Sequence, residues 1–162
     1  DERIIRRMLS WTLLVICSGN TCRSPMAEAI ARRELARLRG LSESELASAG
    51  LHVVSAGLYA DHGAPATPEA VQAMQGEGLD LAGHRSRPIS EALIQQADAV
   101  LTMTEAHRQG VVALAPWAES KTARLDPDAD VADPIGGGSA VYRQTAEQIR
   151  AGLTQRMKEL MP

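Results

Sequence analysis

Residues 17–25 have the types and the spacing of a loop that holds a phosphate against a nucleophile. The segment reads Cys-Ser-Gly-Asn-Thr-Cys-Arg-Ser-Pro, with Cys17 and Arg23 in the pattern C-x5-R-S. An apolar run precedes Cys17 and a helical pattern follows Arg23, so several backbone N–H groups of the loop can point at one centre and bind an anion. Such a site stabilises a thiolate beside a bound phosphate. We therefore interpret Cys17 as a nucleophile toward phosphorus.

The alternative interpretation of Cys17 is a buried strand residue, because free cysteine is among the most buried residue types. Two further features favour the nucleophile. Gly19 and Asn20 tolerate unusual backbone dihedrals, and Pro25 suits the start of a helix. No G-K-[ST] follows, which excludes a Walker-type nucleotide loop, and the three-glycine dinucleotide pattern is missing.

A nucleophilic phosphatase also needs an acid, because the departing atom must be protonated and water must later be activated. One loop of the sequence holds four aspartates. Asp133 is the candidate, because Pro134 fixes the backbone beside it and glycines at 136–138 let the loop move over a pocket. We expect the other three to be solvated surface residues: Asp126, Asp128 and Asp130.

The sequence predicts no metal site and no other cofactor. The aspartate loop begins like a calcium loop, but Val131 replaces the required glycine and Gly137 stands where a glutamate is needed. The histidines lack the i,i+4 pair or the cysteine partners of a metal site, and we expect each at the surface. They are His52, His62, His84 and His107.

Apolar runs and helical periodicities alternate along the chain, which is typical of a parallel sheet between two helix layers. Thr67, Ser90 and Thr104 are suitable helix caps. Strands are expected at 11–17, 51–56, 98–103 and 121–125. Helices are expected at 26–38, from 68 to a C-terminus near 76–78, and at 89–96, 105–114 and 139–160. On the last helix we expect a buried side made by Val141, Ile149, Leu153 and Leu160.

These elements predict an α/β fold, a three-layer α/β/α domain with a central four-stranded parallel sheet. We expect a single domain over residues 1–162, with residues 1–10 as an N-terminal extension or a lead-in to the first strand. The loop after the first strand then lies at the carboxyl edge of the sheet, where open α/β sheets place their sites.

Composition excludes several classes of protein. The net charge of −3 argues against a nucleic-acid binder with a basic surface, and no apolar run is long enough to cross a membrane. The apolar stretch after residues 1–7 runs into the cysteine loop, so it is not a removable signal peptide. Both cysteines lie in that loop and not in a distributed disulfide framework, which favours a reducing cytoplasm.

Several motifs together resemble the low-molecular-weight protein tyrosine phosphatase family, over roughly residues 11–160. The resemblance implies a cysteine-dependent phosphatase with no metal and with phosphorylated proteins as partners, which we expect to be monomeric. The motifs are the segment from Cys17 to Glu28, Ser55-Ala56-Gly57, residues 98–104, Asp133-Pro134 and Tyr142.

The same resemblance assigns roles to particular residues. It implies that Cys17 is the nucleophile, that Arg23 clamps the phosphoryl oxygens bidentately and that Asp133 is the general acid. Asn20, Ser24 and Ser55 would hold the loop in shape through hydrogen bonds. The residues expected to bind substrate are Ser18, Gly19, Asn20, Thr21, Cys22, Ser24 and Ile135.

Within the family the chain looks most like the bacterial protein-arginine phosphatase branch. Tyrosine-directed members usually carry an apolar residue at the position of Thr21 and tyrosine after the Asp-Pro pair, where this chain has Ile135. Phenylalanine is more usual than isoleucine at that second position in the arginine branch. A threonine hydroxyl can accept a hydrogen bond from a guanidinium, and aromatic residues, which suit a pocket for a phenol ring, are scarce. We predict removal of phosphate from phosphoarginine residues of proteins through a cysteinyl-phosphate, with phosphotyrosine as the alternative substrate.

Two other functions fit the loop less well. A thiol-dependent arsenate reductase needs further cysteines, and none follows Cys22; a phosphoprotein-binding module would be expected to lose Cys17 or Asp133. The arginine interpretation implies a role in bacterial stress response, opposing an arginine kinase. Cys22 is close enough to Cys17 for a protective disulfide, although it can also be a small packing residue.

Overall fold

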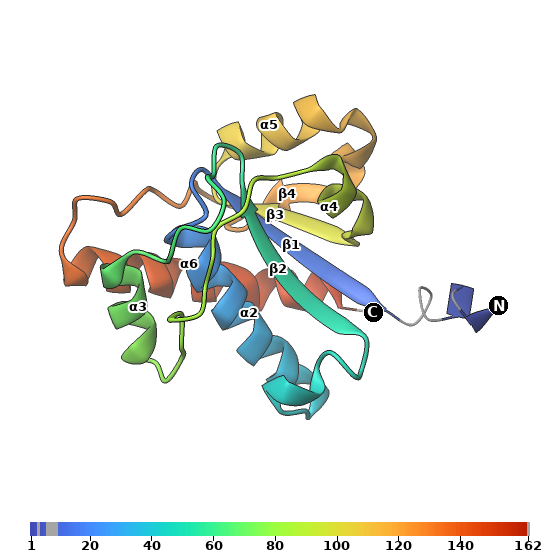
Figure 1. Cartoon of the computed structure of the whole chain (residues 1–162), viewed down its shortest axis with the longest axis horizontal. Coiled ribbons are helices and arrows are strands. Elements are labelled where there is room, and N and C mark those ends of the chain that lie inside the picture. Colours follow the sequence, from blue (N-terminus) through green and yellow to red (C-terminus); the bar gives the residue numbers. More distant parts are fainter. Residues whose placement is uncertain (3, 6–9, 162) are drawn as a thin grey trace.

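A computed structural model describes residues 1, 2, 4, 5 and 10–161. Its centre is a four-stranded sheet in which all neighbouring strands are parallel, in the order β2-β1-β3-β4 (Figure 1). This confirms the predicted α/β fold with a four-stranded parallel sheet. The strands are β1 (Trp11–Cys17), β2 (Leu51–Gly57), β3 (Ala99–Thr102) and β4 (Thr122–Arg124).

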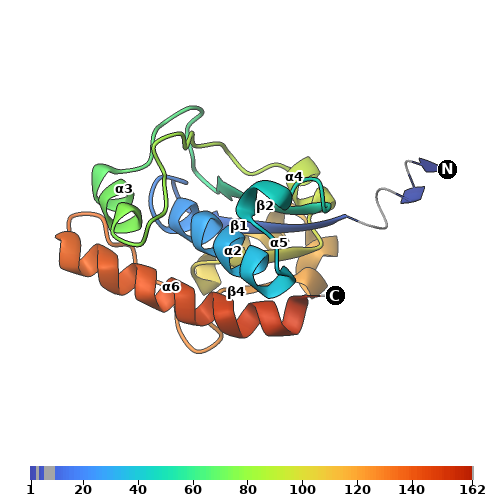
Figure 2. The ribbon, with the colours of Figure 1, turned by 90° about the horizontal axis from the view of Figure 1, so that it is seen from below.

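Helices cover both faces of the sheet. On one face α2 and α6 pack side by side, with α3 beside them at the carboxyl edge (Figures 1 and 2). The opposite face carries α4 and α5 (Figure 1). The helices are α2 (Arg23–Arg39), α3 (Pro68–Gln75), α4 (Glu91–Gln96), α5 (Glu105–Leu114) and α6 (Ser139–Leu160), with 3-10 turns at Glu43–Glu45 and Pro116–Lys121.

The central strand β1 is apolar at nearly every position because it is buried on both faces. Side chains alternate across a strand, so Leu13 and Val15 belong to the core under α2 and α6. Leu14 and Ile16 belong to the second core under α4 and α5. The continuous apolar run before Cys17 is therefore the signature of a central strand between two helix layers.

Local capping fixes where several helices begin. Thr67, Ser90 and Thr104 each accept a hydrogen bond from the backbone N–H three residues later, as expected of N-caps. Helix α2 begins at Arg23, three residues earlier than the predicted Met26. Pro25 is compatible with this because it lies in the first turn, where no intrahelical N–H bond is lost.

The prediction for the last helix is wrong at Val141, which is 41% exposed. Tyr142, the next residue, is 2% exposed and faces the core, together with Ile149 and Leu153. Val141 instead packs on Gly137, where a Cβ would lie 2.8 Å from that of Val141.

No helix among the described residues is long and apolar enough to cross a membrane. The expectation for residues 1–10 falls partly outside the described residues and stays a prediction.

Candidate active site

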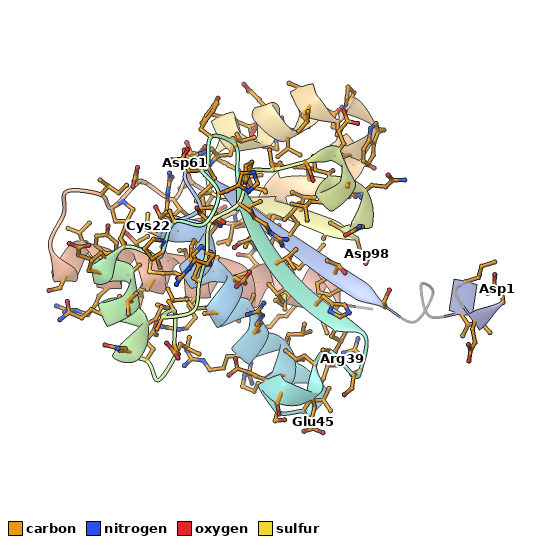
Figure 3. The ribbon with its side chains drawn as sticks, viewed as in Figure 1. Asp1, Cys22, Arg39, Glu45, Asp61 and Asp98 are labelled. Carbon is orange, nitrogen blue, oxygen red and sulfur yellow. The ribbon has the colours of Figure 1, made fainter. Side chains whose placement is uncertain are left out.

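The loop of residues 18–22, here called the catalytic loop, joins the carboxyl end of β1 to α2. Figure 3 shows Cys22 at this edge of the sheet, with Asp98 toward the opposite end of the strands. Cys17 closes β1 and its side chain is buried. Its Sγ lies 2.9 Å from Ser24 Oγ and accepts a hydrogen bond from the Asn20 N–H at 3.3 Å. Both groups can donate to a thiolate, so the surroundings of this sulfur suit a negative charge.

Asn20 fixes the turn of the catalytic loop. It is the only described residue other than glycine with positive φ, at 55°, and it is fully buried. Its Nδ2 donates to Ser24 Oγ at 2.8 Å and to Ser55 Oγ at 2.9 Å, and its Oδ1 accepts from the Arg87 N–H at 3.0 Å. The hydrogen bonds expected of Asn20, Ser24 and Ser55 are thus present, and they explain why a strained backbone is tolerated here.

Strand β2 ends against the same loop. A Cβ at Gly57 would lie 2.5 Å from Ser18 O and 3.0 Å from Asn20 N, so only glycine permits this approach. Beyond it, the Leu58 N–H donates to Cys17 O and the Tyr59 N–H donates to Ser18 O. The Ser-Ala-Gly motif at the end of β2 therefore shapes the catalytic loop from outside it.

Arg23 contributes a buried cation at the first position of α2. Its Nη1 donates to Val131 O at 2.9 Å, and its Nη2 lies 3.9 Å from Asp133 Oδ2. Its Nε is buried and has no hydrogen-bond partner among the described residues. A buried guanidinium N–H without an acceptor is costly, and an anion bound at the helix start would satisfy it.

Asp133 lies beside Arg23 but keeps contact with solvent, since 47% of its side chain is exposed. Its Oδ1 accepts from the Ile135 N–H at 3.1 Å and lies 3.9 Å from Cys22 Sγ. The carboxylate is therefore close to the anion site while its second oxygen has few partners. This arrangement suits a group that must exchange protons with substrate and water.

Asp130 is exposed at the surface, as expected, and Asp126 is half-buried, but both carboxylates also have hydrogen-bond partners. Asp130 accepts hydrogen bonds from the Glu105 N–H at the start of α5 and from Arg124, and these bonds hold the pKa of its carboxyl below the usual value. Asp126 accepts from Gln148 Nε2 at 2.9 Å. Asp130 is thus committed to its backbone and arginine partners and is a poorer acid than its sequence position alone would allow.

The expectation for two of the histidines is also wrong, because they contact the catalytic loop. His84 Nε2 lies 2.7 Å from Asn20 O, and His107 Nε2 lies 2.8 Å from Ser18 Oγ. His107 is only 5% exposed, and its burial together with the nearby Arg23 charge lowers its pKa to about 4. No local signal marks these residues, since the two contacts join positions 64 and 89 residues apart.

Within the described chain, no group of three or more histidine, cysteine or acidic residues could hold a metal ion.

Thr21 and Ile135, the two positions at which the sequence departs from tyrosine-directed members, lie in the catalytic loop and next to the acid loop's proline, respectively. Thr21 accepts a hydrogen bond through its carbonyl from the Thr67 N–H at 2.8 Å, while its hydroxyl bonds to no described residue. Ile135 follows the acid loop and is 63% exposed. Tyr59, attached to Ser18 through its backbone, is 82% exposed, so an aromatic residue does lie next to the loop despite their scarcity in the sequence.

Cys22 is buried and unpaired, as is Cys17. Burial, followed by the charges of Cys17 and Asp133, raises the pKa of Cys22 to about 12. Cys22 is therefore a neutral thiol near pH 7, and Cys17 is the better candidate for the nucleophile.

Reversible oxidation of this loop is a testable expectation. A sulfenic acid formed on Cys17 would be trapped by Cys22 as a disulfide, which protects Cys17 from irreversible oxidation; the raised pKa of Cys22 slows this step. After peroxide and then dithiothreitol, we expect full recovery of activity in the wild type and poor recovery in Cys22→Ser. Equal recovery in the two proteins would mean that Cys22 only packs the loop.

Comparison with known proteins agrees with this geometry. The protein-arginine-phosphatase of Bacillus subtilis is 36% identical over 153 residues, which cover 91% of this chain and 95% of the relative. A probable low molecular weight protein-tyrosine-phosphatase, EpsP of Ralstonia nicotianae, is 34% identical over 144 residues, covering 88% and 90%. The solved structure of the YwlE arginine phosphatase from Geobacillus stearothermophilus superposes with a TM-score of 0.78 at 33% identity, covering 93% of this chain and 92% of that one.

The match extends over nearly the whole fold. The family described as low molecular weight phosphotyrosine protein phosphatase matches residues 12–161, which contain the catalytic loop, the acid loop and all of the sheet except Trp11. On this coverage, and on relatives above 30% identity along almost their full length, the chain belongs to the low molecular weight phosphotyrosine protein phosphatase family.

Proposed function

We propose that this chain is a cysteine-dependent phosphatase that removes phosphate from phosphoarginine residues of proteins. The observation that carries the proposal is the buried Nε of Arg23 at the start of α2, which has no acceptor among the described residues. Cys17, whose sulfur lies beside two hydrogen-bond donors, is at the end of β1, and the catalytic loop joins it to Arg23. Every group that the reaction needs is a side chain or a backbone amide, so the proposal involves no cofactor.

The proposed reaction has two steps. The Cys17 thiolate attacks phosphorus, the phosphoryl group passes to Sγ, and Asp133 gives a proton to the departing atom. Asp133, now ionised, takes a proton from water, which attacks the cysteinyl-phosphate and releases inorganic phosphate and the thiolate. Arg23 and the loop N–H groups bind the phosphoryl oxygens in both steps, where charge develops in the transition states.

The choice of phosphoarginine rests on hydrogen bonding at the pocket. A guanidinium carries several N–H donors and no acceptor. The Thr21 hydroxyl has no hydrogen-bond partner among the described residues, and the half-exposed Asp133 carboxylate, 3.9 Å from Arg23 Nη2, can accept from a second guanidinium. Phosphotyrosine is the second candidate, favoured by the exposed ring of Tyr59 beside the loop. Relatives that carry either name are about equally similar in sequence, so the pocket chemistry decides.

Thr21→Ile tests this choice. The substitution removes a hydroxyl and adds apolar bulk, so a guanidinium N–H loses its acceptor at a cost of about 1–3 kcal/mol, or roughly 5- to 150-fold in rate. A phosphotyrosine ring loses nothing. We expect the ratio of kcat/KM for phosphoarginine over phosphotyrosine peptides to fall by about tenfold or more, mainly through the arginine substrate.

Thr12→Ile is a matched control, because Thr12 is half-buried near the start of β1, at the end of the strand away from the catalytic loop. It should leave the ratio unchanged. If Thr21→Ile slows both substrates equally, Thr21 braces the loop and does not select the substrate. If the wild-type protein cleaves only phosphotyrosine peptides, the second candidate function replaces the first.

The cellular setting belongs to the same proposal. A phosphoarginine phosphatase opposes an arginine kinase, and we place this one in the bacterial cytoplasm, in the stress response. We further propose that it is a monomer whose partners are phosphorylated proteins, not nucleic acid or membrane. Size-exclusion chromatography with light scattering measures the oligomeric state directly.

A further inference from the structure

The hydrogen bond between His107 and Ser18 connects the catalytic loop to the helix layer that carries α4 and α5. Ser18 directly follows the nucleophile, and its Oγ lies 2.8 Å from His107 Nε2. Asn20 has hydrogen-bond partners in other elements, namely Ser55 on β2 and the segment containing His84 and Arg87. In the described part of the chain, His107 provides the single hydrogen bond between α5 and residues 18–22.

His107 is held rigidly enough to fix its partner. It lies in the first turn of α5, where its N–H donates to Thr104 Oγ1 at 3.0 Å. The start of this helix is also capped by Asp130, which accepts from the Glu105 N–H. A Cβ at Gly110, one turn further along, would lie 2.7 Å from Leu58 Cδ1, so α5 packs tightly on the segment that binds the carbonyl of Cys17.

The surroundings of His107 indicate a specific role and not only packing. The side chain is 95% buried, and its Nδ1 has no hydrogen-bond partner within the described chain. An apolar residue of similar size would avoid the cost of this unpaired atom, so packing alone does not account for an imidazole at this position. The interaction that the imidazole makes is the one with Ser18, and its low pKa keeps the ring neutral beside the Arg23 cation.

We propose that His107 is a positioning residue, which holds Ser18 so that the N–H groups at the start of the catalytic loop converge on the transferring phosphoryl group. The inference rests on the proposed phosphatase reaction but not on the choice of phosphoarginine. Loop N–H groups stabilise charge that develops in the transition state, so a small displacement of the loop lowers kcat more than it weakens ground-state binding of phosphate.

A double-mutant cycle on the full chain tests this, with p-nitrophenyl phosphate as substrate and inorganic phosphate as the ground-state probe. Ser18→Ala and His107→Leu should each lower kcat/KM by about 5- to 30-fold through kcat, the effect of losing one buried hydrogen bond. The inhibition constant of phosphate should change by less than about threefold. The double variant should be no slower than the slower single variant, because both remove the same interaction.

His107→Gln should restore the hydrogen bond to Ser18, because the glutamine side-chain amide can take the place of the ring Nε2. We expect a kcat within about threefold of wild type for this variant. His52→Leu is the matched control, since His52 is exposed on β2 away from the loop; its activity should be unchanged. Should His107→Leu fail to fold, Ser18→Ala and His107→Gln still decide the question.

Three outcomes overturn the inference. The effects of Ser18→Ala and His107→Leu on kcat could multiply in the double variant, His107→Gln could be as slow as His107→Leu, or Ser18→Ala could have the kcat of the wild type. Failure of the proposed function gives a different result, because the wild-type protein would then not hydrolyse p-nitrophenyl phosphate at all.

Discussion

Cys17→Ser should abolish turnover of every phosphorylated substrate while leaving the fold and phosphate binding largely intact. Serine keeps nearly the same volume, and its hydroxyl can accept the hydrogen bonds that Ser24 and the Asn20 N–H make to the sulfur. Unlike a thiolate, an un-ionised hydroxyl is a weak nucleophile, and no described base contacts this position. Steady-state rates on aryl phosphate and phosphoarginine peptides measure the loss.

Two controls make the result interpretable. Circular dichroism and the thermal midpoint should match wild type, and isothermal titration with inorganic phosphate should still report binding, because Arg23 and the loop N–H groups are unchanged. Retention of a tenth of the wild-type rate would contradict a cysteinyl-phosphate mechanism.

Asp133→Asn should slow substrates with poor leaving groups far more than activated ones. An amide cannot donate a carboxylic proton, so hydrolysis of alkyl-type phosphates and phosphoguanidines should fall by about 10²–10⁴-fold, the usual size of general acid catalysis. p-Nitrophenolate leaves without a proton, so its release in the first turnover should change little. Pre-steady-state measurement of the nitrophenol burst separates this step from the later attack of water.

Asp128→Asn is the matched control, because Asp128 is exposed in the same loop and its carboxylate bonds to no described residue. It should behave as wild type. If Asp130→Asn reproduces the dependence on leaving group instead, the acid is misassigned. The structure makes Asp130 a poor acid, since its carboxylate is occupied by the Glu105 N–H and Arg124.

The sequence predicts the features that depend on near neighbours. Strand β1, the caps at Thr67, Ser90 and Thr104, and the turn at Asn20 all follow from residue types within a few positions, and the structure has each of them. The parallel sheet follows as well, because strands buried on both faces read as continuous apolar runs.

Features that depend on distant contacts were not predictable in the same way. His84 and His107 have no metal or catalytic spacing in the sequence, and only the fold brings them to the loop. Asp130 is in a polar loop of the sequence, and its hydrogen bond to the Glu105 N–H joins positions 25 residues apart, so the sequence alone does not reveal that bond. The wrong prediction for Val141 has a simpler cause. Successive residues of a helix are 100° apart around its axis, so an error of one residue assigns Val141 to the buried face in place of Tyr142.

The catalytic loop has a consequence for how the chain folds, because its partners are far away along the sequence. Ser55 and His107 bond to loop residues that lie 35 and 89 positions away, and Val131 bonds to Arg23, next to the loop, 108 positions away. Contacts of such separation form late, after the entropy of closing long loops has been overcome. An oxyanion therefore finds no site in a partly folded chain and binds only the native state. Its binding energy adds to the stability of the whole domain, so phosphate in the medium slows unfolding of segments that it never touches.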